Sequence, residues 1–186
     1  MPAPGRKPQG NAIMTGLDAP TVPGAAGFHD ETVKGQKRGF VFTNPTLDNG
    51  GTILRGSNSV SVTYSHEMVE MIGDGPCNRW ADGPANADGV ALDYAIELAD
   101  PVEGDSYDID GVAVSNFVLP AWFSGAGKVF DFLRRLRAPL SLDAGGYISY
   151  STDLSNWKQV NAERAKHKYS RQQRRYTSRA RRMTQP

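Results

Sequence analysis

The chain has 186 residues, of which 39% are hydrophobic and 22% are charged, with 20 glycines and 12 prolines. This length accommodates one domain of ordinary size with terminal extensions, and it excludes a second full domain. The formal net charge of +1 conceals two opposite parts. Residues 158–186 hold ten Lys and Arg and one acid, a net charge of +9, whereas residues 1–157 hold eleven bases and nineteen acids, a net charge of −8. The sequence therefore predicts an acidic domain followed by a basic tail.

Two further classes of protein are disfavoured by the sequence. Cys77 is the single cysteine, so an intramolecular disulfide is excluded and a reducing compartment such as the cytoplasm is the default expectation. No apolar run is long enough to span a bilayer, and the N-terminus lacks the basic start and apolar segment of a signal peptide. We therefore expect no membrane partner and no signal-dependent export.

The N-terminal residues 1–27 contain five prolines and five glycines and only scattered apolar side chains. Such a segment buries too little surface to offset the entropy lost on ordering, so we expect an extended arm that is ordered only along a partner. The core domain is expected over residues 28–157, beginning with a strand at 39–43.

The best helix of the chain is predicted over residues 60–73. Val60, Tyr64, Met68 and Ile72 recur at helical spacing, and a serine or asparagine at 57–59 is available as the N-cap. Its end is expected at 73–76, where a glycine can adopt a left-handed conformation. Because Met68, Val69, Met71 and Ile72 lie beside His66 and are apolar, we expect this helix to be buried.

The rest of the domain reads as short strands, at 94–98, 107–109, 112–118 and 147–150, with a hairpin turn at Asp110-Gly111. One long helix among short antiparallel strands predicts an α+β fold in which the helix packs against a mostly antiparallel sheet.

The predicted helix carries the residues with the clearest chemistry. His66 and Glu70 are four residues apart and project from one face, so they can share a cation, and Glu67 lies close enough to act as a general base. Zinc is the first expectation, and the carboxylate ligand makes calcium, magnesium or manganese plausible. The alternative is an exposed helix histidine with two glutamates on a solvated face.

A third ligand is expected from the acidic run at 97–103. Glu97, Asp100 and Glu103 are the candidates, and Pro101 would make the loop rigid enough to orient a carboxylate. The alternative is a solvated acidic loop. His29 is the other histidine of the domain, and Asp30 beside it could orient its ring, although a surface histidine is the more ordinary interpretation.

Taken together, these motifs resemble a zincin-like domain found in tailed-phage and bacterial genomes, over roughly residues 27–157. The residues that carry the resemblance are Gly-Phe-His-Asp-Glu at 27–31, Phe-Val-Phe at 40–42, Ser-His-Glu-x-x-Glu at 65–70 with Asp74 and Asn78, Tyr-x-x-Glu-x-x-Asp-Pro-x-Glu at 94–103, the run at 114–123 and Gly-Gly-Tyr at 145–147. The chain departs from the family pattern at 74–76, where Asp-Gly-Pro stands in place of Asp-Pro.

This resemblance implies a metallopeptidase-like core with His66 and Glu70 as ligands and Glu67 as the base. It also implies a component of a phage particle, so the localisation expected is the virion and the partners are other virion proteins or copies of this chain. The leading hypothesis is a virion-associated structural protein with a metallopeptidase-like domain, either retaining peptide hydrolysis or keeping only the scaffold. A nucleic-acid-binding subunit that acts through its tail is the alternative.

Residues 158–186 predict a basic helix, because they lack proline before the last residue and are rich in Ala, Arg, Gln and Lys. Apolar and aromatic residues repeat at every seventh position, at Ala162, Tyr169, Tyr176 and Met183. The tail would dock on nucleic acid or on an acidic protein surface, and the alternative is a solvated disordered segment.

Deleting residues 158–186 is expected to abolish salt-dependent DNA binding while leaving the acidic domain folded. If the tail neutralises Z phosphates, the logarithm of the binding constant should fall with a slope of about −0.9Z against the logarithm of salt concentration. Fluorescence anisotropy with two unrelated duplexes measures this slope and the expected indifference to sequence. Full-strength binding by the truncated protein would assign nucleic-acid binding to the acidic domain.

Overall fold

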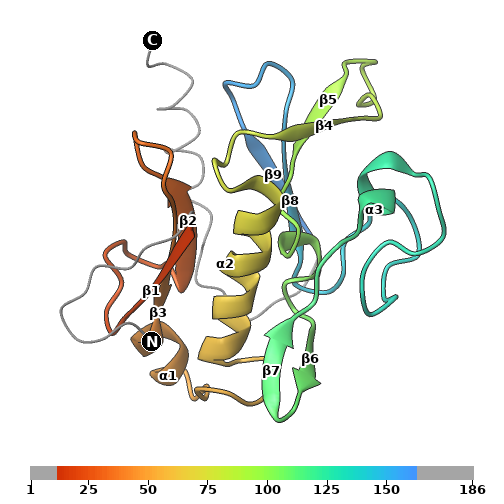
Figure 1. Ribbon diagram of the computed structural model, residues 1–186. Helices are drawn as coiled ribbons and strands as arrows, with labels where there is room; N and C mark the ends of the chain where they lie inside the picture. Colours follow the sequence, from red (N-terminus) through yellow and green to blue (C-terminus); the bar gives the residue numbers. More distant parts are fainter. Residues whose placement is uncertain (1–11, 163–186) are drawn as a thin grey trace.

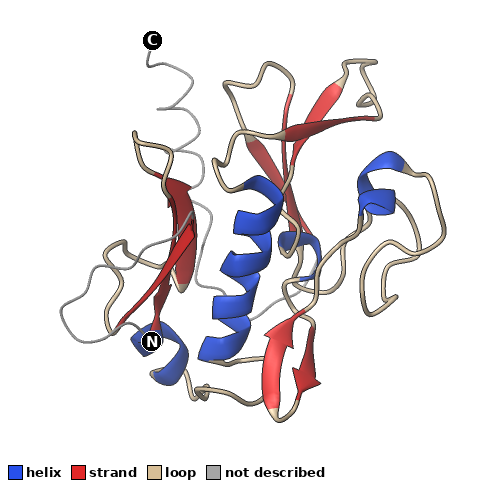
Figure 2. Cartoon of the chain, viewed as in Figure 1, coloured by secondary structure: helices blue, strands red, loops and turns tan. Residues whose placement is uncertain are grey.

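The computed structural model describes residues 12–162 and shows one long helix surrounded by short strands (Figure 1). Figure 2 shows the same arrangement by secondary structure. In chain order the elements are β1 (Ala12–Leu17), β2 (Gly27–Glu31), β3 (Lys37–Phe42), α1 (Thr43–Leu47), α2 (Val60–Asp74), β4 (Trp80–Gly83), β5 (Leu92–Ala95), the 3-10 helix η1 (Asp100–Val102), β6 (Ser106–Ile109), β7 (Val112–Ser115), α3 (Pro120–Ser124), β8 (Tyr147–Ser151) and β9 (Lys158–Asn161).

The strands form three small sheets. One has the order β1-β3-β2, a second has the order β4-β5-β8-β9, and β6 pairs with β7. Pairing is antiparallel except between β1 and β3, which run parallel. Helix α2 lies between the first sheet and the β6–β7 hairpin, and it contacts β2, β3 and β7 (Figure 1). The predicted α+β class with mostly antiparallel pairing is confirmed.

Local sequence accounts for both ends of α2. Ser59 is the N-cap, and its side chain accepts a hydrogen bond from the Val62 N–H at 3.4 Å. The C-terminal end differs from the expectation of a left-handed glycine, because Gly75 has a φ of −52°. Cys77 instead takes a φ of 51°, and its N–H bonds to the Asp74 carbonyl. The helix thus ends inside the predicted range, and the left-handed residue that follows it is Cys77 rather than a glycine.

The buried face of α2 is its ionisable face. The residues of the helix that are buried are Val62, Thr63, His66, Glu67, Glu70, Met71 and Asp74. Met68 is 39% exposed and Ile72 is 76% exposed. The helix is therefore buried as expected, and Met71 contributes to this at 5% exposure, but Met68 and Ile72 face outward because the inward direction is set by the polar side chains that meet β2 and η1.

Both ends of the described chain belong to sheets. Strand β1 lies within the segment expected to be an arm, and it pairs along its length with β3, from Ala12 opposite Lys37 to Leu17 opposite Phe42. Backbone hydrogen bonds of a ladder require no apolar side chains, so these residues are ordered on their own domain rather than only on a partner. Strand β9 pairs with β8, so residues 158–161 are a strand rather than part of a helical tail, and the domain extends beyond the expected end at residue 157. The deletion that spares the sheet therefore begins after Ala162. Residues 1–11 and the rest of the predicted tail helix, at 163–186, lie outside the described residues.

The β6–β7 hairpin matches its sequence signal. Asp110 has a φ of 50° and Gly111 a φ of 85°, the left-handed pair that a tight two-residue turn requires. The strand expected at 94–98 is shorter than predicted, because β5 ends at Ala95 and the chain then leaves the sheet toward η1. No helix between residues 12 and 162 is long and apolar enough to cross a membrane.

An apolar core holds the loop that carries η1. It consists of Val102, Val118, Trp122, Phe130, Leu136 and Ile148. Trp122 is fully buried, and its indole N–H donates to the Ser141 carbonyl at 2.8 Å. The Val118 N–H donates to the Leu98 carbonyl at 2.7 Å, so the segment that precedes η1 is tied to this core.

Gly146 allows the chain before β8 to pass against η1. A Cβ atom at this position would overlap the carbonyl oxygen and carbon of Pro101, which are backbone atoms that cannot rotate away. We expect Gly146→Ala to displace η1 and to lower the free energy of unfolding by about 1–3 kcal/mol, as overpacking of an interior usually does. Urea denaturation measures the change.

Gly16→Ala is the matched control, because no atom lies within 4 Å of the Cβ that it would add. Equal stabilities for the two variants would show that η1 is not held by this contact.

Candidate functional site

Three segments bring ionisable side chains together inside the domain. Helix α2 contributes His66, Glu67 and Glu70, and strand β2 contributes His29. The segment from β5 through η1 contributes two carboxylates, Glu97 and Asp100. These six side chains, which we call the His–Glu centre, belong to residues that are 4% exposed or less.

The first half of the centre surrounds His66. Its Nε2 lies 2.9 Å from Glu70 Oε1 and 3.2 Å from Asp100 Oδ1. The pairing of His66 with Glu70 follows from their four-residue spacing on α2. Asp100 is oriented by η1, where Pro101 fixes the backbone. The structure therefore brings the predicted pair together with a carboxylate from the predicted acidic run.

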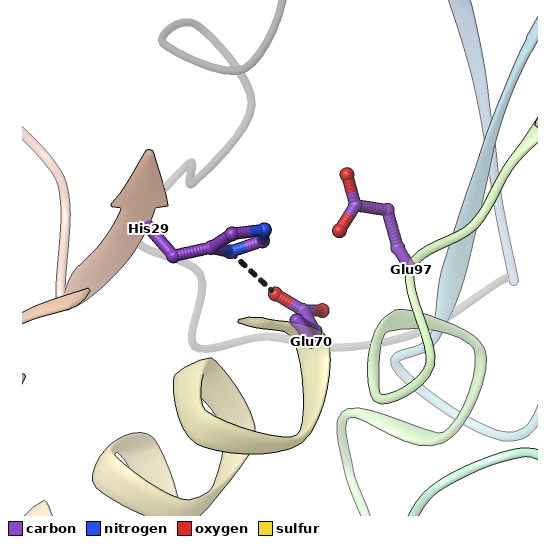
Figure 3. Close-up of side chains that lie close together, drawn as sticks. All are labelled: His29, Glu70 and Glu97. Carbon is purple, nitrogen blue, oxygen red and sulfur yellow. Dashed lines mark ion pairs between the residues drawn. The ribbon is translucent and has the colours of Figure 1, made fainter. Parts of the chain in front are cut away.

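The second half of the centre surrounds His29. Its Nδ1 lies 3.4 Å from Glu67 Oε2 and 3.5 Å from Glu70 Oε2. His29, Glu70 and Glu97 each place one ligand atom within 4.8 Å of the others. Figure 3 shows the Glu97 carboxylate approaching from the loop side toward His29 on β2 and Glu70 on α2.

A hydrogen bond on the far side of the ring orients His29. Its Nε2 lies 3.2 Å from the Asp74 carbonyl oxygen, which can only accept a hydrogen bond. Nε2 therefore carries a hydrogen, and Nδ1 is the nitrogen that faces the carboxylates. The Asp74 carboxylate has a different task, since it accepts from the N–H groups of Asn78 at 3.1 Å and Arg79 at 2.8 Å and so anchors the turn after α2.

Glu103 and His29 do not lie where the sequence predicts. Glu103 belongs to neither cluster found among residues 12–162; it is partly buried at the end of η1, where its N–H bonds to the Asp100 carbonyl. His29 is buried at 3% exposure and so is not the surface histidine that we expected, nor does Asp30 orient its ring, because Asp30 pairs with Arg38 through two contacts of 2.8 Å. Successive residues of a strand face opposite sides, so the alternation of β2 is the signal that separates His29 from Asp30.

The environment of His29 favours its charged form. Burial alone would lower the pKa of His29, but the Cys77 thiol and the Glu67 and Glu70 carboxylates outweigh burial and raise this pKa well above its ordinary value. In the protein without a cation, the His29 imidazolium therefore offsets part of the negative charge of the centre.

The spacing of the donor atoms fits a divalent cation. Zinc binds nitrogen and oxygen ligands at about 2.0–2.1 Å, so two ligands at a tetrahedral angle lie about 3.3 Å apart. The 2.9 Å and 3.2 Å separations from His66 Nε2 to Glu70 and Asp100 are close to this value, and the group around His66 whose ligand atoms all lie within 4.8 Å of one another is His66, Glu67 and Glu70. Carboxylate oxygens outnumber imidazoles, and this donor set is suitable for manganese as well as zinc.

An apolar groove lies on the opposite face of α2. It is lined by Tyr64 and Met68 of the helix, by Ile53 and Leu54 of the preceding loop, and by Val112 of β7, among others. Tyr64 and Met68 are separated from Glu70 by about 120° and about 160° around the helix axis, at 100° per residue. The groove and the His–Glu centre are therefore separate features.

Comparisons with protein-family models, with curated proteins and with solved structures found no match to this chain. The zincin-like resemblance rests on the sequence motifs.

Outside the centre, Asp105 faces Asp143 near η1. Burial, together with the hydrogen bond to Asp143 and the charge of that residue, raises the pKa of Asp105 from 3.8 to about 6. The folded state thus binds this proton more tightly than the unfolded state. The resulting contribution to stability is present below about pH 4 and is lost as the pH rises through about 6.

We expect Asp105→Asn to remove this loss, because an amide does not ionise. The urea midpoint of the variant minus that of the unmodified protein should be larger at about pH 7.5 than at about pH 4. Asp143→Asn removes the facing charge and should shift the midpoint in the same direction. An equal change at both pH values would contradict the raised pKa of Asp105.

Proposed function

We propose that this protein is a metal-dependent peptide hydrolase of the zincin-like class. The observation that carries the proposal is the approach of two carboxylates to His66 Nε2, with Glu70 Oε1 at 2.9 Å and Asp100 Oδ1 at 3.2 Å. Glu67 lies on the same helix as His66 and Glu70. A metallopeptidase helix has this arrangement, in which two ligands lie four residues apart and a glutamate lies between them.

In this proposal His66, Glu70 and Asp100 hold a divalent cation, zinc first, with manganese, magnesium or calcium as alternatives. A cation of this kind polarises a peptide carbonyl and lowers the pKa of a water molecule toward neutrality. Glu70 is additionally held by the His29 ring, at 3.5 Å from its second oxygen, so its carboxylate is oriented from both sides.

Glu67 is the group that moves the proton. Its carboxylate would accept a proton from the attacking water and pass it to the amine that leaves. His29 Nδ1, at 3.4 Å from Glu67 Oε2, keeps this carboxylate in place. Gly27 leaves the room that the carboxylate occupies, because a Cβ there would lie 2.9 Å from both Glu67 Cγ and Oε1.

A second candidate function is a metal-stabilised scaffold without catalysis. The observation that favours it is burial: His66 and Asp100 are 1% exposed and Glu70 is fully buried. Structural cation sites are closed in this way, whereas catalytic sites keep a position open to substrate. A scaffold of this kind would gain stability from the cation and would not depend on Glu67.

We further propose that the protein acts as a virion component. This part rests on the sequence resemblance and on the separation of charge, since a basic segment after an acidic domain can contact nucleic acid, another virion protein or a second copy of the chain. Mass spectrometry of purified particles, with the chain at a fixed copy number per particle, is the test.

The test of catalysis is Glu67→Gln. We expect this variant to retain its cation, measured by elemental analysis, and to lose cleavage of a casein or peptide-library substrate by at least about 100-fold, the usual contribution of a general base. Glu31→Gln, at the partly buried end of β2 and outside both clusters, is the charge-matched control and should cleave normally.

If the unmodified protein binds the cation but cleaves no substrate, the metal-stabilised scaffold is favoured over the hydrolase. Cleavage that persists in the Glu67→Gln variant would remove Glu67 from the reaction.

A further inference from the structure

The two oxygens of Glu70 face different histidines. Oε1 lies 2.9 Å from His66 Nε2, and Oε2 lies 3.5 Å from His29 Nδ1. Each half also has a carboxylate of its own, Asp100 beside His66 and Glu97 beside His29 and Glu70. The centre thus has a His66 side and a His29 side that share Glu70, while Glu67 also lies near both histidines, and Figure 3 shows the side that contains His29.

We propose that the His–Glu centre binds two divalent cations bridged by Glu70. The first is the cation of the proposed function, held by His66, Glu70 and Asp100. The second is held by His29 Nδ1, Glu70 Oε2 and Glu97. The inference extends the proposed function from a one-cation to a two-cation hydrolase and rests on it for the first cation only.

Charge supports a second cation. Four carboxylates, Glu67, Glu70, Glu97 and Asp100, belong to residues that are 4% exposed or less. With both histidines neutral, one divalent cation leaves this interior with a formal charge of −2, and two divalent cations leave it neutral. Burying uncompensated charge is costly, so the donor set matches two cations better than one.

The orientation of His29 supports the same conclusion. Its Nε2 hydrogen is directed to the Asp74 carbonyl at 3.2 Å, which leaves Nδ1 directed toward Glu67 and Glu70. Imidazoles that bind metals commonly donate their second nitrogen to a backbone carbonyl in this way, which fixes the ring and the tautomer. A histidine that served only as a counter-charge would not require the third carboxylate, Glu97, near the same atoms.

A bridging carboxylate fits the chemistry of hydrolysis. Pairs of cations in hydrolases lie about 3.5–4 Å apart and together stabilise the attacking and leaving groups. Glu67 is 3.4 Å from His29 and one helical position from His66, so the proposed base would stand beside both halves of the centre. Among the available divalent ions, zinc and manganese suit a mixed imidazole and carboxylate donor set.

The test counts cations in the full-length protein. All proteins carry His167→Ala, so that the third histidine of the chain, which lies outside residues 12–162, does not contribute. After treatment with a chelator, each protein is titrated with Zn²⁺ and separately with Mn²⁺ by calorimetry, and the bound metal is counted by elemental analysis. Circular dichroism confirms that each metal-free variant is folded.

We expect two equivalents per chain in the parent protein and one equivalent in both His29→Gln and Glu97→Gln. Glu103→Gln, which changes a carboxylate of the same acidic run outside both clusters, should still bind two. The Mn²⁺ form of the parent should give the electron paramagnetic resonance spectrum of a coupled pair, and the two variants should give that of an isolated ion.

One equivalent in the parent protein would overturn the second cation and leave the proposed function standing. Two equivalents that persist in both His29→Gln and Glu97→Gln would also overturn it, because the second ion would then lie elsewhere. No bound metal in any of these proteins would overturn both proposals.

Discussion

The structure depends on the burial of four carboxylates beside two imidazoles along the inward face of α2. Removing these groups from water opposes folding, and apolar side chains at the same positions would be more stable. The helix nevertheless turns His66, Glu67 and Glu70 inward and leaves Met68 and Ile72 in solvent. A helix placed for stability alone would turn these three groups toward solvent, and the apolar core around Trp122 offsets the cost of burying them.

The elements around the centre are fitted to it by small local features. Gly27 lets β2 pass close to the Glu67 side chain, and Gly146 lets the strand β8 begin against η1. The Asp74 carboxylate fixes the turn after α2 through two backbone N–H groups, and its carbonyl oxygen orients the His29 ring. The side chains of His29 and Glu67 are therefore positioned by the backbone as well as by their neighbours, which is the support that a site of defined geometry requires.

Local signals were enough to predict part of this arrangement. The Ser59 cap, the four-residue spacing of His66 and Glu70, and the Asp110-Gly111 turn depend only on residues close in sequence, and the structure shows all three. Asp100 could be named as a candidate because Pro101 stiffens its loop, but its choice over Glu103 depends on how η1 packs. His29 and strand β1 were not foreseen, because each is placed by pairing with β3 across many residues. Hydrophobic periodicity found the helix and misjudged its inward face, since that pattern assumes that apolar side chains are the buried ones.

The sequence separation of the ligands determines when the centre can form during folding. His66 and Asp100 are 34 residues apart, and His29 and Glu67 are 38 apart, whereas α2 and the β6–β7 hairpin are local. Contacts that close long loops form after local ones in most small domains, so the carboxylates meet after most of the chain has collapsed. Interactions that are absent from the transition state change the unfolding rate and leave the folding rate nearly unaltered. A cation bound at this centre would therefore act mainly on the lifetime of the folded chain, giving it kinetic persistence beyond what its equilibrium stability alone provides.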